Sequence, residues 1–342
     1  MSGPTPNEIS MITPTVDFER DGLHFGSLRV PHSYDRSAYG HIPIPVAVAK
    51  RGDGPTVLLT GANHGDEYEG PIGLLKLIRG LDISRLRGRL IVVPALNYPA
   101  FLAARRVSPI DNINLNRTFP GKRNGTVTEM IAHYVETVLL PMADYAVDFH
   151  AGGGSLNYLP TLFAPRSDDP AEREKLDRIV AAFAAPRTLF IDGGRAMSGE
   201  DRVIGAAARR NDVFFLTGEF GGGASVNLDG LAAVERGIAG MLDAIGVLSP
   251  AAPLRACPPS RRLVMDGPGH YAFAPCNGMF EPAFRLGDEI AAGQLAGLIY
   301  DPVQPWKDPT PVTFASAGVA LCIRTFGLAE AGDCLGHLGR DE

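Results

Sequence analysis

The chain has 342 residues, of which 45% are hydrophobic and 20% are charged, which is the usage of ordinary globular proteins. Its formal net charge of -6 argues against a nucleic-acid-binding protein, because such proteins usually present a basic face. The four cysteines include no Cys-x-x-Cys pair, which argues against a zinc ribbon or a thioredoxin-like dithiol. No apolar stretch approaches the roughly 20 residues that span a bilayer, and the N-terminus lacks the cationic start and apolar run of a secretory signal. We therefore expect a cytoplasmic enzyme without a membrane or nucleic-acid partner.

After an N-terminal extension of about 45 residues that we expect to be rich in β-strands, short apolar runs alternate with amphipathic stretches. Strands are predicted at Thr56–Thr60, Arg89–Val93, Asp144–Phe149, Thr188–Ile191 and Val213–Thr217. Helices are predicted at Gly70–Leu81, Thr128–Leu140, Ala171–Ala184 and Leu228–Ile245. Buried strands that alternate with helices indicate an α/β fold with a mixed, mostly parallel sheet covered by helices. In such sheets ligand sites gather at the carboxyl ends of the strands.

The alternation ends near Leu248–Pro253, where prolines become frequent. The segments that follow, such as Arg262–Met265 and Gly318–Cys322, are short and separated by glycine and proline, which is typical of an all-β unit. We therefore predict a catalytic domain over residues 1–250 and a smaller β domain over residues 255–342. Its turn spacing is similar to that of biotinyl/lipoyl-like barrels, so we expect a barrel-like domain that covers the mouth of the active site.

Two motifs carry residues that can bind a metal ion. His64 and Glu67 lie three residues apart just after the first buried strand, where a turn of helix or a tight loop can aim both at one point. His150 ends another apolar strand and is followed by a glycine-rich turn. Two imidazoles and one carboxylate suit Zn²⁺ and leave a fourth position for water, as in catalytic zinc sites. Asp148 could orient one ligand, although we expect strand alternation to point it to the opposite face. Taken singly, each motif is also compatible with a surface pair or a hydrogen-bonded loop residue.

A third motif places Glu219 after a strand and before three glycines. Beside an open zinc position, this carboxylate can take a proton from water and pass it to a leaving nitrogen. On its own it is equally well explained as a turn cap.

A fourth motif is the long polar loop after Arg89–Val93, which contains Arg105-Arg106 and Asn116-Arg117. An arginine fork binds a carboxylate through two parallel hydrogen bonds. A second arginine can stabilise the oxyanion of a tetrahedral intermediate. The alternative is a solvated basic loop.

His64-x-x-Glu67, Asn116-Arg117, His150 and Glu219, in this order, resemble the aspartoacylase and succinylglutamate desuccinylase family, a branch of the zinc carboxypeptidase-like fold. The resemblance implies one zinc ion per chain. The implied roles are zinc ligation by His64, Glu67 and His150, general base and acid catalysis by Glu219, and binding of the substrate carboxylate by Asn116 and Arg117.

The same resemblance implies that Arg106 faces the developing oxyanion, with its neighbour Arg105 as the alternative. An arginine upstream of the glutamate motif often joins carboxylate recognition in the family. Of Arg209 and Arg210, we take Arg209 as the candidate for this role.

Within the family, the wording of the His64, Arg117 and His150 motifs is most similar to bacterial N-acetyl-2,4-diaminobutyrate deacetylases of ectoine degradation. The substrate implied is therefore a small N-acylated amino acid, with an aspartoacylase- or desuccinylase-like deacylase as the alternative. A carboxypeptidase-type peptidase and a metal-binding protein without turnover are further alternatives. A serine hydrolase is disfavoured because Gly-x-Ser-x-Gly is absent. We expect a homodimer, because homo-oligomers are common among such enzymes.

Overall fold

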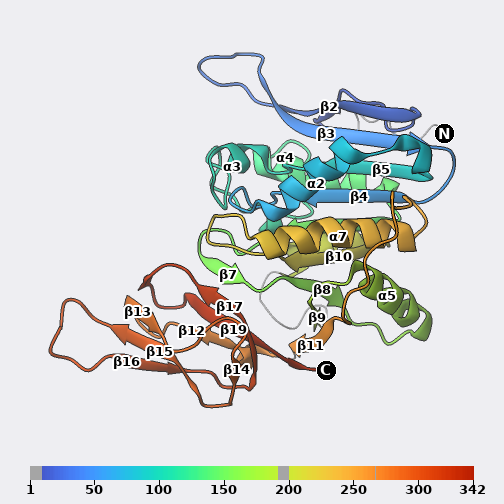
Figure 1. The fold of residues 1–342 in the computed structure, drawn as a ribbon. Coiled ribbons are helices and arrows are strands. Elements are labelled where there is room, and N and C mark those ends of the chain that lie inside the picture. The colour runs from blue at the N-terminus through green and yellow to red at the C-terminus, as the bar shows by residue number, and fades with distance from the viewer. Residues whose placement is uncertain (1–9, 192–199, 266) are drawn as a thin grey trace.

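The computed structural model describes residues 10–191, 200–265 and 267–342 (Figure 1). Within these residues the strands form one 15-stranded sheet and one 4-stranded sheet. The strands of the large sheet are β1 (Thr13–Pro14), β2 (Gly22–Pro31), β3 (His41–Arg51), β4 (Thr56–Gly61), β5 (Gly88–Val93), β6 (Tyr145–His150), β7 (Leu156–Tyr158), β8 (Thr161–Pro165), β9 (Arg187–Ile191), β10 (Phe214–Glu219), β11 (Arg261–Met265), β12 (Tyr271–Phe273), β14 (Glu289–Ile290), β17 (Gly318–Arg324) and β19 (Cys334–Asp341). Those of the small sheet are β13 (Gly278–Pro282), β15 (Leu295–Tyr300), β16 (Thr310–Thr313) and β18 (Leu328–Ala329).

The centre of the large sheet is parallel, with β5, β4, β6 and β10 as successive neighbours. β4 and β5 are buried along their whole length, which explains their continuous apolar runs. The sheet is mixed because β3 pairs with β5 and β8 pairs with β10 in antiparallel fashion. The predicted α/β fold with a mixed sheet covered by helices is confirmed.

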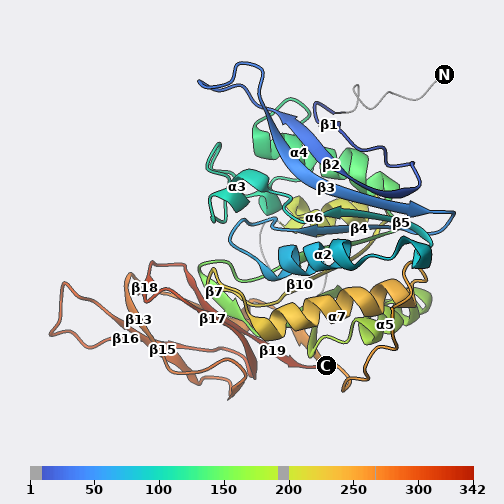
Figure 2. The ribbon, with the colours of Figure 1, turned by 45° about the horizontal axis from the view of Figure 1, so that its top comes forward.

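Helices cover both faces of this sheet (Figure 2). The main ones are α2 (Glu69–Gly80), α3 (Tyr98–Leu102), α4 (Val127–Tyr134), α5 (Pro170–Phe183), α6 (Ile204–Arg210) and α7 (Leu228–Ala244). Side chains of α2, α5 and α7 pack into one hydrophobic core, and side chains of α4 and α6 pack into another. The helix predicted over Thr128–Leu140 is α4 followed by a π-helical turn at Val135–Leu139. Among the described helices, none is both long and apolar enough to cross a membrane.

The C-terminal segment builds the small sheet and also extends the large one. β11 pairs in parallel with β9, and β19 then pairs with β11, so the large sheet continues past residue 260. The small sheet packs through its own apolar core, which includes Phe280, Phe284 and Phe314. β7 joins the two parts of the chain, because it pairs with β17 and follows closely on β6.

The pairing register brings the polar motifs to one edge of the sheet. Gly61 at the end of β4 lies opposite Phe149 of β6, and His150 at the end of β6 lies opposite Glu219 at the end of β10. The carboxyl ends of three parallel neighbours therefore carry the residues on which the chemistry was predicted to depend.

Candidate active site

His64, Glu67 and His150 form a buried group in which one ligand atom from each lies within 4.8 Å of the others. Glu67 stands between the two imidazoles. Its Oε1 atom is 2.7 Å from Nδ1 of His64, and its Oε2 atom is 2.9 Å from Nδ1 of His150. Two imidazole nitrogens and a carboxylate that converge on one point are a donor set that fits a divalent metal ion such as zinc.

The loop between β4 and α2 is held in place by close packing against the segment that follows β5. The N–H group of Gly65 donates to the carbonyl of Arg105 at 2.9 Å. A side chain at Gly65 would place its Cβ atom 2.0 Å from the carbonyl carbon of Ala100, so this contact requires glycine. This close contact fixes the start of the His64–Glu67 turn relative to the loop that carries Arg105 and Arg106.

Burial and neighbouring charges shift the pKa values of the three candidate ligands. Burial alone would raise the pKa of the Glu67 carboxyl, but the two flanking imidazoles hold that pKa far below its ordinary value. Burial lowers the pKa of His64, which favours the neutral imidazole that binds metal ions. Against its burial, the pKa of His150 is raised by the carboxylates of Asp148 and Glu67.

Asp148 lies directly behind His150. Its Oδ2 atom is 2.7 Å from Nε2 of His150, and it also accepts hydrogen bonds from Thr60 at 2.6 Å and Asn63 at 2.8 Å. Our expectation that strand alternation would separate the two was wrong, because residues two apart on a strand share a face. The carboxylate thus orients His150 with its Nδ1 atom toward Glu67.

Asn114 plays the corresponding part for His64 and was missed from the sequence. Its Oδ1 atom lies 3.1 Å from Nε2 of His64 and accepts the N–H group of Asn116 at 2.9 Å. The available signal was its place two residues before Asn116, where an asparagine commonly caps a turn. Each of the two candidate histidine ligands therefore has its second ring nitrogen held by a protein oxygen.

Glu219 ends β10 beside His150, and its Oε2 atom is buried with no hydrogen-bond partner among the described residues. Burial, reinforced by the negative charge of Glu67, raises the pKa of Glu219 to about 8. A carboxyl group in this position can both accept and release a proton near neutral pH.

Arg106 and Asn116 reach the same group from the loop after β5. Nη1 of Arg106 is 3.3 Å from Nδ1 of His64 and 3.7 Å from Oε1 of Glu67, while the side chain remains 44% exposed. Nδ2 of Asn116 lies 3.4 Å from Nε2 of His150. Arg117 shares a short 3-10 helix with Asn116 and donates to its carbonyl at 2.7 Å. The structure thus brings Arg106 and Asn116 to the candidate ligands, and Arg117 lies next to Asn116 on the same short helix.

The structure does not bring Arg209 to this group. Arg209 is an exposed residue in the last turn of α6, before the amino end of β10, whereas Glu219 lies at the carboxyl end. Arg210 pairs with Glu136 through both carboxylate oxygens at 2.7 and 2.8 Å. Among the upstream arginines that the structure describes, Arg202 contacts the neighbourhood of the Asn116 helix, because its carbonyl accepts the N–H group of Phe119 at 3.2 Å.

Glycine loops after β6 and β10 close around the site and meet the C-terminal segment. The N–H group of Gly152 donates to the carbonyl of Gly221 at 3.0 Å, and that of Ala224 donates to Gly153 at 2.9 Å. The N–H group of Thr325 donates to the carbonyl of Ser155 at 3.0 Å, and its hydroxyl donates to Gly154. The loops that carry His150 and Glu219 are therefore tied to each other and to the residues after β17.

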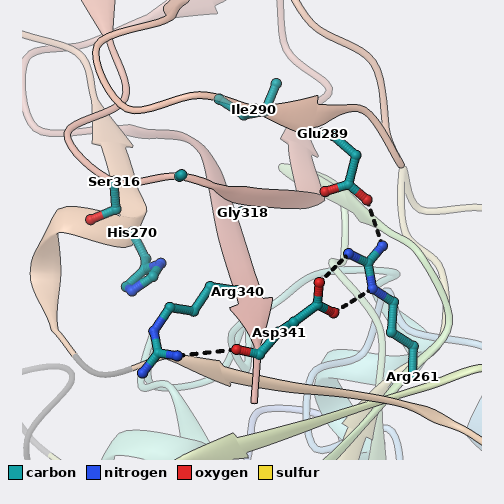
Figure 3. A pocket seen from close by; sticks show the side chains of 9 residues that line it. Arg261, His270, Glu289, Ile290, Ser316, Gly318, Arg340 and Asp341 are labelled. Atoms are coloured by element: carbon teal, nitrogen blue, oxygen red, sulfur yellow. Dashed lines mark hydrogen bonds and ion pairs between the residues drawn. The ribbon is translucent and has the colours of Figure 1, made fainter.

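A separate pocket of about 540 Å³ lies in the C-terminal segment (Figure 3). Within it, the guanidinium of Arg261 binds Asp341 at 2.7 and 2.9 Å and Glu289 at 2.6 Å. No predicted site residue lines this pocket, and its acidic side chains are paired with Arg261. These ion pairs connect β11, β14 and β19, and we assign them a structural role.

Comparison with known proteins gives relatives of nearly full length. A sequence model described as the succinylglutamate desuccinylase/aspartoacylase catalytic domain matches residues 53–245. The N-alpha-acetyl-L-2,4-diaminobutyric acid deacetylase of Halomonas elongata is 38% identical over 328 residues, which are 95% of this chain and 94% of that protein.

Solved structures give the same picture. The product-bound ectoine utilization protein EutE (DoeB) from Ruegeria pomeroyi is 38% identical, with a TM-score of 0.89 over 96% of this chain and 98% of that chain. A succinylglutamate desuccinylase/aspartoacylase from Rhodobacter sphaeroides is 34% identical, with a TM-score of 0.90 over 97% of this chain and 99% of that chain. The similarity therefore includes the C-terminal sheets as well as the matched catalytic segment.

Proposed function

Because this chain belongs to the succinylglutamate desuccinylase/aspartoacylase family and is an amide hydrolase, we propose that it removes the acetyl group from N-α-acetyl-L-2,4-diaminobutyrate in ectoine degradation. The products are acetate and L-2,4-diaminobutyrate. The observation that carries the proposal is the convergence of His64, Glu67 and His150 with the buried carboxyl of Glu219 at one edge of the sheet. The family and reaction class predicted from the motifs are confirmed.

We infer that His64, Glu67 and His150 hold one zinc ion per chain. Bound there, zinc supplies Lewis acidity toward water and toward the amide carbonyl. The protein prepares the three side chains for this task, because Asp148 and Asn114 fix the ring orientations and Glu67 is kept ionised by the imidazoles.

Glu219 acts as the proton shuttle in this proposal. It takes a proton from the attacking water, and it delivers a proton to the nitrogen as the amide C–N bond breaks. Its raised pKa suits both steps, because a group that titrates near the working pH can be reloaded in each cycle. A site that merely stored a metal ion would not require a carboxyl without a hydrogen-bond partner at this place.

Arg106, Asn116 and Arg117 bind the substrate and its transition state in this proposal. Arg106 lies beside the ligand set and stabilises the oxyanion that forms when water attacks the carbonyl. Asn116 and Arg117, on the neighbouring 3-10 helix, hold the substrate carboxylate. This short helix spans Leu115–Arg117. Its position is fixed by the N–H group of Ile204, which donates to Oδ1 of Asn116 at 3.0 Å.

We further propose that the C-terminal β domain limits the site to small substrates by covering its mouth. The support is the pair of hydrogen bonds from Thr325 to Gly154 and Ser155, which place the residues after β17 against the loop that follows His150. If the mouth is covered in this way, the site excludes the longer chains that a carboxypeptidase-type peptidase cuts. A cytoplasmic location and a homodimer remain predictions, and the four free cysteines are compatible with a reducing compartment.

A deacylation screen tests the proposal. Purified enzyme loaded with zinc is offered N-acetyl, N-succinyl and N-aspartyl derivatives of amino acids together with short peptides, and the released amine is measured. N-α-acetyl-L-2,4-diaminobutyrate should give the highest kcat/KM. Faster release from a succinylated amino acid, an aspartyl compound or a peptide would replace the proposed substrate.

A further inference from the structure

Asp66 lies between His64 and Glu67 in sequence, and the mechanism above gives it no task. Its side chain is only 7% exposed. Oδ2 accepts the N–H group of Gly154 at 2.7 Å, whereas Oδ1 is buried with no hydrogen-bond partner among the described residues. A buried carboxylate oxygen without a partner is costly, so its retention points to a group that arrives with the substrate. His64 and Glu67 are comparably buried, so burial does not separate Asp66 from the candidate metal ligands.

An open place adjoins this carboxylate, where Gly154 has no side chain. A Cβ atom built on Gly154 would lie 3.4 Å from Oδ2 of Asp66, 3.6 Å from the Phe326 ring and 4.0 Å from Ala224. These are ordinary contact distances, so the place is neither filled nor blocked. Three site segments meet here: the loop after His150, the loop after Glu219 and the C-terminal residues after β17.

The lining has the composition of a site for an alkylammonium group. A carboxylate supplies a charge-assisted hydrogen bond, and the face of an aromatic ring attracts a cation. Phe326 is 54% exposed and thus available to a ligand. The guanidinium of Arg324, which lies 5.8 Å from the ring centroid, is paired with Asp333 at 2.7 Å and so adds little net charge.

N-α-acetyl-L-2,4-diaminobutyrate carries a second amine, at carbon 4, which hydrolysis does not touch. Like the amine of lysine, it is protonated at neutral pH. Resting on the proposed function, we propose that Asp66, with Phe326 beside the open place at Gly154, binds this side-chain ammonium and selects amino acids with a short cationic side chain. The substrate would then be held at its carboxylate by Arg117 and at its ammonium by Asp66, with the acetamide between them.

The test compares two substrates that differ in one group. N-α-acetyl-L-2,4-diaminobutyrate is the cationic substrate, and N-acetyl-L-norvaline replaces its ammonium with a methyl group. The readout is the selectivity ratio, which is kcat/KM for the first compound divided by kcat/KM for the second. Wild-type enzyme should show a ratio of at least about tenfold, the value of one hydrogen bond to a charged group.

Asp66→Asn keeps an acceptor for Gly154 and removes the charge. The ratio should fall at least about tenfold, chiefly through KM for the cationic substrate. Asp243→Asn is the matched control, because Asp243 is exposed on α7 and should leave the ratio unchanged. Phe326→Leu keeps an apolar side chain without the aromatic face and should lower the ratio about two- to fivefold. This exposed position carries the test if Asp66→Asn does not fold.

The outcomes separate the subsite from the proposed function. A wild-type enzyme that hydrolyses both compounds equally well, or variants that lower both rates in proportion, would overturn the subsite and leave the deacetylase in place. Wild-type enzyme that hydrolyses neither compound would overturn the proposed function and the subsite together.

Discussion

Oδ2 of Asp148 lies 2.7 Å from Nε2 of His150, and this contact turns the Nδ1 atom of His150 toward Glu67. Asp148 on β6 is itself held by hydrogen bonds from Thr60 on β4 and from Asn63 in the loop after β4. Both strands and this loop therefore determine the orientation of the His150 imidazole. Burial would raise the pKa of Asp148, but His150 and these hydrogen bonds lower it. The orientation of the candidate ligand is therefore built into the fold.

Asp148→Asn tests this orientation. The amide can still receive a hydrogen bond, but it loses the charge that favours the Nε2-protonated ring, so affinity for zinc should fall about 10- to 100-fold. Competition with a chromophoric chelator measures the dissociation constant. The circular dichroism spectrum should match that of the wild-type protein. Unchanged zinc affinity in a folded variant would show that Asp148 contributes to packing but does not orient a zinc ligand.

Metal content tests the ligand set. Wild-type protein should contain about one zinc ion per chain, because two imidazoles and one carboxylate form a catalytic site. His64→Ala should lose most of it, and dialysis against a chelator should abolish activity until zinc is returned. His41→Ala, an exposed residue of β3, is the control. Elemental analysis that finds full zinc in His64→Ala would remove His64 from the ligands.

Arg117→Lys tests carboxylate binding. A lysine keeps the charge but cannot offer two parallel donors, so kcat/KM should fall at least about tenfold, mainly through KM. Arg209→Lys is the matched control, since Arg209 lies beyond the amino end of β10, and it should stay within about twofold of wild type. Steady-state kinetics on the acetylated substrate decide the matter. Equal losses in both variants would place Arg209 in the carboxylate site.

The pH dependence of stability tests the junction between β7 and β19. His337 is fully buried against Tyr158, with Nε2 3.1 Å from the hydroxyl, and burial lowers the pKa of His337 to about 4. Below pH 6.5 the imidazole of His337 binds a proton in the unfolded chain but stays neutral in the folded protein. The contribution of His337 to the free energy of unfolding is therefore complete above pH 6.5 and decreases as the pH drops toward 4.

The expected loss is about 1.4 kcal/mol for each pH unit in this window. His337→Gln keeps a hydrogen-bonding group but does not titrate, so it should lack this part of the dependence. Urea unfolding of both proteins from pH 7 to pH 5 gives the difference. Parallel stability curves would show that His337 is solvated in the folded protein.

The sequence predicted the central sheet well because its strands are buried on both faces and carry long apolar runs, as in β4 and β5. The order of the motifs was informative because parallel strands end at one edge. Arg209 shows the limit: spacing from Glu219 places it near in sequence, but the direction of β10 puts it at the other end.

Other features depend on contacts between distant segments. Asn114 was missed because its partner, His64, lies 50 residues away in the chain. The continuation of the large sheet through β11 was missed because pairing with β9 leaves no mark on the local pattern. The unpartnered carboxylate oxygen of Asp66 is likewise recognised only once the surrounding residues, Gly154 and Phe326 among them, are in place.

The central claim is that Glu219 moves the proton, and Glu219→Gln tests it most directly. The amide keeps the shape of the side chain but cannot exchange a proton at neutral pH, so kcat should fall about 10²- to 10⁴-fold. Zinc content should stay near that of the wild type, because Glu219 lies beside the ligand set and not within it. Glu235→Gln, on the exposed side of α7, should retain full activity. A Glu219→Gln enzyme with full zinc and full kcat would contradict the account, because some other residue would then be the base.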